Sequence, residues 1–204
     1  MEKLEHLESQ IKVSDEVEER FKYYLEYFSL TEEDLQKPLL DVGVNKGYFV
    51  KYIRDVIGNK QAYGIEKYPS KIDQSNDGIV AGDGLIIPFR DDTFEIVVAK
   101  NYLPMFVTKA EEMETAFLEL LRVTKSGGKI MADISTPEKE LAKAQPEDSS
   151  SHRKWLEARY EGSKKFKSFL EKQTADGLSI QFKDVYFKKD GDDLHAVIMH
   201  VEKP

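Results

Sequence analysis

The stretch Pro-Leu-Leu-Asp-Val-Gly-Val-Asn-Lys-Gly-Tyr, residues 38–48, constrains the fold more than any other part of this chain. Its apolar run at 39–42 is typical of a buried parallel strand. Gly43 then allows a tight turn, and Gly47 allows a helix to begin close to whatever lies above it. The segment 48–57 continues with apolar residues on one helical face. The stretch therefore predicts a buried strand, a tight turn and the start of a helix.

Two classes of nucleotide ligand bind at such a turn, and the spacing of the glycines separates them. Dinucleotide-binding folds have the pattern G-x-G-x-x-G, in which the middle glycine lets the backbone approach a pyrophosphate. That glycine is absent here, since the pattern is Asp41-x-Gly43-x-x-x-Gly47. The Asp41 carboxylate would instead face a cationic group. The turn therefore favours a ligand with an amino group and no pyrophosphate, although ordinary strand-to-helix turns also contain short glycine patterns.

Further strands and a helix follow this unit. Residues 62–66 predict a second strand that ends in Glu66, 25 positions after Asp41. A carboxylate at about that distance accepts hydrogen bonds from ribose hydroxyls in nucleotide-binding folds. Gly82-Asp83-Gly84 directly follows the third expected strand. The other expected elements are strands at 78–81, 95–99 and 129–134 and a helix at 110–123.

Both ends of the chain add elements to this core. Ser14 is expected to cap a helix, and a cap formed by Thr31 and Asp34 is expected to start a second, short helix. An apolar stripe on the first helix is more often core packing than a substrate lid; it comprises Val17, Phe21, Tyr24, Leu25 and Phe28. At the other end, residues 178–187 and 194–201 predict a hairpin with an Asp-Gly turn, and residues 136–151 predict a mobile loop.

Charge is distributed unevenly along the chain. Residues 1–35 hold 11 acids and 4 bases, whereas residues 152–172 hold 7 bases and 3 acids. The basic segment predicts an amphipathic helix, which Gly162-Ser163 could interrupt. Its lysines are expected on a solvated face; in the alternative interpretation, Arg153, Lys154 and Arg159 contact an acidic substrate.

Composition indicates a single soluble domain. The chain has 204 residues, of which 40% are hydrophobic, and no stretch reaches the length of a membrane span. Its N-terminus does not resemble a signal peptide, so a cytoplasmic location is expected. The absence of cysteine excludes disulfides, thiolate metal sites and cysteine nucleophiles. No metal site is expected either, because the four histidines are not paired at ligand spacing: His6, His152, His195 and His200.

Taken together, the chain resembles the class I S-adenosylmethionine-dependent methyltransferases, in particular the branch that includes ubiquinone and menaquinone biosynthesis enzymes. The resemblance covers residues 38–135 and rests on four blocks in order: 39–43, 63–66, 82–95 and 120–129. It implies an α/β fold with a doubly wound, Rossmann-like, mostly parallel seven-stranded sheet, an antiparallel C-terminal hairpin and three α/β/α layers. Residues 1–204 would form one domain: a helical extension at 1–37, a cofactor-binding core at 38–135, and a loop, basic helix and hairpin at 136–204.

The resemblance also implies where the cofactor, S-adenosyl-L-methionine, binds. Asp41, Gly43 and Gly47 would border its methionine part, Glu66 would bind the ribose diol, and Asp83 would accept a hydrogen bond from the adenine amino group. The chain departs from the family at Asn45, where a third glycine is common, and at Lys46, where a small residue is common. The expected cofactor-binding set is Asp41, Gly43, Asn45, Gly47, Glu66, Lys67, Asp83, Gly84, Asn101 and Tyr102.

The methyl acceptor and the catalytic residues are not identified by the sequence. Asn101-Tyr102-Leu103-Pro104 departs from the signature of enzymes that methylate amino groups of nucleic-acid bases or glutamine, and its expected role is a loop over the adenosine. The candidate groups near the acceptor are Lys100, Asn101, Tyr102, Asp133, Ser135, Tyr23, Tyr24 and Tyr27. A small-molecule acceptor is favoured, because the chain is acidic and has no nucleic-acid-binding module. The alternatives are a methyltransferase on protein or RNA and a non-catalytic S-adenosylmethionine-binding protein.

Overall fold

A seven-stranded sheet forms the centre of the protein in the computed structural model, which describes residues 14–72, 76–103, 107–134, 150–189 and 192–204. The strand order is β3-β2-β1-β4-β5-β7-β6. The strands are β1 Leu39–Val42, β2 Ala62–Glu66, β3 Ile79–Ala81, β4 Phe94–Ala99, β5 Thr124–Asp133, β6 Ser179–Lys189 and β7 Asp192–Glu202. The first five run parallel, and β7 pairs antiparallel with both β5 and β6. The predicted fold class is therefore confirmed.

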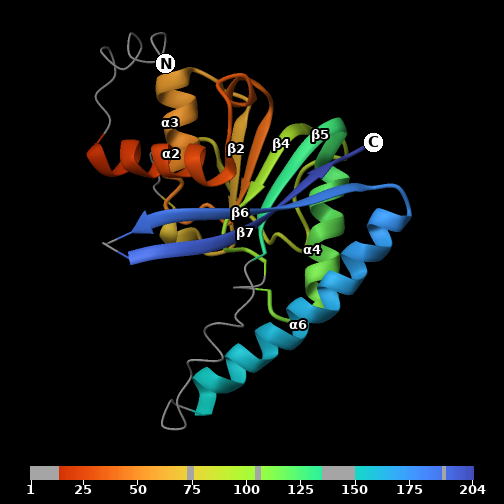
Figure 1. Cartoon of the computed structure of the whole chain (residues 1–204). Helices are drawn as coiled ribbons and strands as arrows, with labels where there is room; N and C mark the ends of the chain where they lie inside the picture. The colour runs from red at the N-terminus through yellow and green to blue at the C-terminus, as the bar shows by residue number, and fades with distance from the viewer. Residues whose placement is uncertain (1–13, 73–75, 104–106, 135–149, 190–191) are drawn as a thin grey trace.

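Helices cover both faces of this sheet. Figure 1 shows α2 and α3 on one side and α4 and α6 on the other. The helices are α2 Asp15–Phe28, α3 Tyr48–Tyr52, α4 Ala110–Val123 and α6 Ser150–Ala175, with short turns η1 Asp34–Gln36, η2 Ile53–Ile57 and η3 Pro69–Lys71. The helix expected at 48–57 thus has two parts, because η2 is a wider π-helical turn. No helix in the described part of the chain is long and apolar enough to cross a membrane.

Along each strand, side chains point alternately to the two faces of the sheet. This alternation decides which residues at the ends of the strands lie on the face that α2 covers. In β4, Val97 and Ala99 pack in the cluster that contains α4 and α6, whereas Ile96 and Val98 pack in the cluster that contains α2 and α3. Successive side chains of a strand point to opposite faces. By the same alternation, Asp41 follows Leu39 on the α2 face, as Asp133 follows Met131.

Helix α2 packs its aromatic stripe against α3. The Phe21 ring stacks on Tyr52 with centroids 3.9 Å apart, and the Tyr24 ring stacks on Phe49 at 4.5 Å. Contacts between aromatic rings add to the free energy gained by burying them. The stripe therefore completes the core, as the core-packing interpretation predicts. It includes Tyr27 as a buried member, whereas the expected member Leu25 is only partly buried.

Of the two expected helix caps, the structure has the one formed by Thr31 and Asp34 and lacks the one formed by Ser14. The backbone N–H of Thr31 donates to Asp34 Oδ2 at 3.0 Å, and the Asp34 N–H donates to Thr31 Oγ1 at 3.2 Å, so this reciprocal cap is confirmed. Ser14 occupies the N-cap position of α2, but its side chain makes no capping hydrogen bond.

Two expected boundaries are wrong. Strand β5 begins at Thr124 instead of 129, directly after α4, because Thr124 pairs with Phe94 of β4 ahead of a register shift. Helix α6 runs through Gly162 without a break. The glycine there allows close packing, since a Cβ would lie 2.0 Å from the Thr108 carbonyl oxygen. Of the loop expected at 136–151, residues 150 and 151 belong to α6, and the rest lies outside the described residues. The expected Asp-Gly turn, Ser135 and His6 also lie outside them.

Candidate active site

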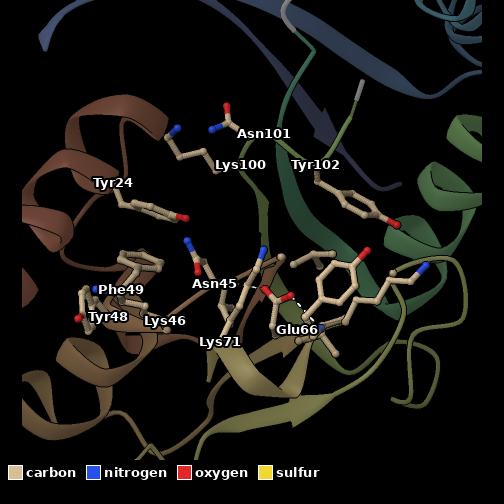
Figure 2. Close-up of a pocket in the computed structure, with 18 of the residues that line it drawn as sticks. Tyr24, Asn45, Lys46, Tyr48, Phe49, Glu66, Lys71, Lys100, Asn101 and Tyr102 are labelled. Atoms are coloured by element: carbon tan, nitrogen blue, oxygen red, sulfur yellow. Dashed lines mark hydrogen bonds between the residues drawn. The ribbon is translucent and has the colours of Figure 1, made fainter. Parts of the chain in front are cut away.

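A pocket of about 710 Å³ lies at the C-terminal ends of β1, β2 and β4, beneath α2 (Figure 2). In open α/β sheets, ligands bind in the crevice at this edge of the strands. Nine of the ten residues expected to bind the cofactor line the pocket: Gly43, Asn45, Gly47, Glu66, Lys67, Asp83, Gly84, Asn101 and Tyr102. The structure therefore brings this set together, while the part that each residue plays in binding stays a prediction.

The turn after β1 is tight because three of its residues have positive φ. Gly43 has φ 82°, Asn45 has φ 56° and Gly47 has φ 76°. Asparagine tolerates this left-handed region better than most residues, so Asn45 can stand where a glycine is common. At Gly47 the positive φ disfavours any side chain, and a Cβ would lie 1.9 Å from Ile79 Cδ1, so the Ile79 side chain would have to move. The sequence of the turn thus satisfies its geometry despite the missing glycine.

Glu66 presents a fixed carboxylate at the end of β2. Its side chain is 6% exposed, and both oxygens accept backbone hydrogen bonds: Oε2 from the N–H of Asn45 at 2.8 Å and Oε1 from the N–H of Tyr68 at 3.0 Å. Each carboxylate oxygen accepts more than one hydrogen bond. Glu66 therefore has acceptor capacity for ligand hydroxyls in the pocket while the backbone holds it in place.

Asp83 and Tyr102 form the other side of the pocket. The Asp83 carboxylate is 2.8 Å from Lys67 Nζ and accepts the N–H of Leu85 at 3.0 Å, and the hydrogen bond with Lys67 is the main cause that lowers its pKa. The Tyr102 ring lies against Gly84, where a Cβ would be 2.3 Å from the tyrosine hydroxyl oxygen. That hydroxyl is buried and has no hydrogen-bond partner among the described residues. A polar group of a ligand would satisfy it.

Asp41 is the one residue of the expected cofactor-binding set that does not line the pocket, and its part in binding stays a prediction. It is 1% exposed and does not line the pocket. Neither carboxylate oxygen has a hydrogen-bond partner within the described part of the chain. Burial raises the pKa of Asp41 to about 8, against the opposing influence of Lys100. Because charged forms are costly to bury, a cation near the turn would favour the ionised carboxylate.

The candidate groups near the acceptor divide into two layers. Tyr23, Tyr24, Lys100 and Asn101 line the pocket. Behind them, the buried Tyr27 hydroxyl donates to Asp133 Oδ2 at 2.5 Å. Burial is the main cause that raises the pKa of Tyr27, and it also raises the pKa of Tyr23 to about 12. Both phenols are therefore protonated at neutral pH, so neither serves as a general base there.

Sequence reasoning missed the polar residues that α2 contributes to the pocket. Glu16 and Arg20 line it together with Tyr24, at successive spacings of four residues. Residues at this spacing share one helix face, which is the signal that would have found them. The Glu16 carboxylate also contacts two residues next to this turn. It is 3.2 Å from Lys46 Nζ, in the turn after β1, and accepts a hydrogen bond from the hydroxyl of Tyr48, the first residue of α3, at 3.1 Å. The N-terminal end of α2 is thereby connected to the turn after β1.

Metal-ligand clusters are absent from the described residues, with no group of three or more histidines and acids placed to hold an ion. Of the histidines, His195 Nε2 is 2.6 Å from Asp184 Oδ1 on the terminal hairpin. Burial is the main cause that lowers the pKa of His200, which lies in the same hairpin. Neither histidine is among the residues that line the pocket.

Comparison with known proteins gives one family match. Residues 40–132 match the model of a family described as "Methyltransferase domain". The demethylmenaquinone methyltransferase of Streptomyces griseus subsp. griseus is 39% identical over 58 residues, which is 28% of this chain and 24% of that protein. The corresponding protein of Streptomyces avermitilis is 38% identical over 53 residues, which is 26% of this chain and 21% of that protein. The chain thus spans about a quarter of the length of the curated relatives it matches.

Solved structures resemble nearly the whole chain. The PH0226 protein from Pyrococcus horikoshii OT3 has a TM-score of 0.59 at 16% identity, covering 94% of this chain and 92% of that chain. The plantazolicin methyltransferase BpumL, in complex with a pentazolic desmethylPZN analog and SAH, has a TM-score of 0.59 at 13% identity, covering 93% and 84%. At these identities the likeness shows the fold alone.

Proposed function

We propose that this protein transfers a methyl group from S-adenosylmethionine to a small-molecule acceptor. The match of residues 40–132 to the family described as "Methyltransferase domain" supports the proposal. The observation that carries the proposal is one pocket that combines the tight turn after β1 with two carboxylates, Glu66 and Asp83. The turn lacks the glycine that a pyrophosphate requires. The carboxylates can accept hydrogen bonds from a diol and an amino group.

The residues present fit this cofactor. Glu66 would accept the ribose hydroxyls, and Asp83 with Gly84 would hold the adenine. The unpartnered, buried carboxyl of Asp41 lies behind the turn, where it would favour a cationic methionine part. When bound, S-adenosylmethionine supplies an activated methyl group on a sulfonium, a good leaving group.

The chain's own contribution would be positioning and the exclusion of water. Helix α2 covers one side of the pocket with Tyr23 and Tyr24, while Lys100 and Asn101 line it from the end of β4. Holding reactants in line removes much of the entropic barrier to a transfer reaction, and a dry site strengthens electrostatic contacts. No base is assigned in this proposal, since Tyr23 and Tyr27 are protonated at neutral pH.

A small-molecule acceptor is supported by charge and by the relatives' names. The chain carries a net charge of −8, which disfavours nucleic acid. The two Streptomyces relatives are named demethylmenaquinone methyltransferases, that is, enzymes named for a small-molecule substrate. The cytoplasmic location expected from the composition is part of this proposal.

Calorimetry with three ligands tests the cofactor. We expect binding of S-adenosylmethionine and S-adenosylhomocysteine and none of NAD. Tight NAD binding without a response to the adenosyl ligands would contradict the proposal. A second assay supplies methyl-tritiated S-adenosylmethionine and fractionated cell extract. Label in the small-molecule fraction supports the proposed acceptor class, label in protein or RNA favours the alternative enzyme, and binding without any transfer favours a non-catalytic protein.

A further inference from the structure

The two edges of the sheet differ in length. At one edge β3 has only 3 residues, Ile79–Ala81, whereas β6 at the other edge has 11, Ser179–Lys189 (Figure 1). Short length, prolines and bulges are common means by which proteins prevent an edge strand from pairing with another chain. β6 uses none of these means, because it contains no proline and pairs with β7 residue for residue from Ser179 to Lys189. The β6 edge is therefore suited to pair with a further strand.

The backbone of β6 offers hydrogen-bonding groups along this edge. The Ile134 N–H donates to the Val197 carbonyl oxygen at 2.9 Å, so the backbone groups of Val197 face β5. Asp184 lies opposite Val197 in the pair of β6 and β7. In an antiparallel ladder, hydrogen-bonded and non-hydrogen-bonded pairs alternate. Asp184 and every second residue from it, such as Phe182 and Tyr186, therefore direct their N–H and C=O groups away from β7.

The core holds β6 from the face of the sheet that α2 covers. Val185 is 8% exposed and packs in the cluster that contains α2 and α3, and Lys183 Nζ donates to Ser29 Oγ at 2.6 Å. On the other face, Phe182 is 49% exposed and Tyr186 is 74% exposed. Residues four apart in a strand point to the same face. Two exposed aromatic side chains thus share one face of a strand that the core keeps in place.

Asp184 is the midpoint of β6, which runs from Ser179 to Lys189. Two copies of β6 that pair antiparallel over their full length must therefore place Asp184 opposite Asp184 of the second copy. Residues at equal distances from the midpoint then face each other, so Phe182 lies opposite Tyr186 of the second copy, and the two-fold axis repeats this pair. Aromatic pairs across strands stabilise a sheet. The register with the most backbone pairing is also the one that pairs the exposed aromatic side chains.

We propose that β6 is a dimerisation strand, which pairs antiparallel with β6 of a second copy of this chain and joins two sheets into one. A second copy is the occupant because this edge is complementary to itself in both length and aromatic side chains. Two Asp184 carboxylates would face each other at the axis, and each is engaged within its own hairpin by His195 Nε2 at 2.6 Å. The surface is separate from the proposed methyl transfer, since the residues that line the pocket include none of β6.

Analytical ultracentrifugation of the full chain measures the dimer. We expect a reversible equilibrium between monomer and dimer, and a wild-type protein that stays monomeric up to about 100 μM overturns the inference. The double variant Phe182→Thr/Tyr186→Thr should dimerise at least about tenfold more weakly, because both aromatic pairs are lost. Threonine keeps a high preference for strands, so β6 should still form. Unchanged dimerisation of this variant contradicts the proposed register.

Proline and alanine at position 184 separate backbone pairing from the effect of the side chain. Asp184→Pro removes an N–H that faces away from β7, so the ladder between β6 and β7 keeps its hydrogen bonds. We expect this variant to be monomeric, with a melting temperature close to that of Asp184→Ala. Asp184→Ala is the matched control and should dimerise at least as tightly as the wild type, because like charges no longer face each other. A folded Asp184→Pro protein that dimerises as tightly as Asp184→Ala overturns the inference.

Single cysteines test the register in the folded protein, since the chain contains no cysteine of its own. Directly opposite residues of a hydrogen-bonded pair have Cα atoms about 5.5 Å apart, which is within the range of a disulfide. With oxidised glutathione as the oxidant, Asp184→Cys should form a disulfide-linked dimer. Gln181→Cys, at an exposed position of the same strand, is the control and should stay monomeric on denaturing gels, because the two copies of residue 181 would lie about 20 Å apart. Equal cross-linking of both variants, or of neither, overturns the inference.

Discussion

Replacing Asp41 by asparagine should stabilise this protein at alkaline pH. The Asp41 carboxyl is 1% exposed, and its oxygens have no hydrogen-bond partner in the described part of the chain. Burial raises its pKa from 3.8 to about 8. The unfolded chain releases this proton near the ordinary pKa, whereas the folded protein holds it until about pH 8. The free energy of unfolding should therefore fall as the pH rises through this window.

The size of the effect follows from the difference between the two pKa values. A difference of about four units, at about 1.4 kcal/mol each, sets an upper limit of about 6 kcal/mol. We expect about 2–4 kcal/mol, because relaxation and water entry reduce the cost of burying a charge in real proteins. Asparagine has nearly the same shape and carries no charge at any pH, so Asp41→Asn removes this cost.

Urea unfolding at about pH 5, 7 and 9 measures the prediction. The advantage of Asp41→Asn over the wild type should be small at about pH 5, larger at about pH 7 and largest at about pH 9. Asp176→Asn, at an exposed position after α6, is the control and should show no such trend. A stability difference that does not change with pH would refute the reasoning. A variant that loses stability relative to the wild type as the pH rises would show that Lys100 keeps Asp41 ionised.

Three other predictions follow from the same contacts. Glu66→Gln should weaken S-adenosylmethionine binding by about 1–3 kcal/mol in calorimetry, because one charged acceptor is lost; unchanged affinity with a large drop in melting temperature would make Glu66 a scaffold residue. Tyr27→Phe should lower the free energy of unfolding by about 1–2 kcal/mol, because Asp133 loses a buried donor, whereas Tyr186→Phe, at a side chain that is 74% exposed, should not. Removal of residues 1–29 should make the protein unstable and abolish cofactor binding, since the α2 stripe packs in the core; a truncated protein that melts like the full chain would contradict this.

The fold could be predicted because its elements carry local signals. Helix α4 has the bounds expected from its periodicity, β1 lies where a short apolar run meets a glycine turn, and β2 has the expected bounds 62–66. Buried parallel strands and amphipathic helices are encoded in neighbouring residues, so one sequence suffices to find them. The start of β5 could not be predicted, because the pairing of Thr124 with Phe94 joins residues far apart in the chain.

Much of the pocket could be predicted for a similar reason. Glu66 is the last residue of β2 and Asp83 comes two residues after β3, and these parallel strands end at one edge of the sheet. Residues that come directly after such strands must therefore lie close together. The contribution of Arg20 was not predicted, although its helical spacing from Tyr24 contained the necessary signal.

The sequence by itself thus determined the order of the elements, the edge of the sheet where the pocket lies and nine of the ten residues expected to bind the cofactor there. Only the tertiary structure decided how deeply those residues are buried and which groups they contact. Tyr27 and Asp133 are 106 positions apart and still form a buried hydrogen bond. Asp41 lies behind the wall with a raised pKa, because surrounding elements exclude water from it. Desolvation and partner choice depend on contacts between distant segments, and those contacts exist only after the helices have packed on the sheet.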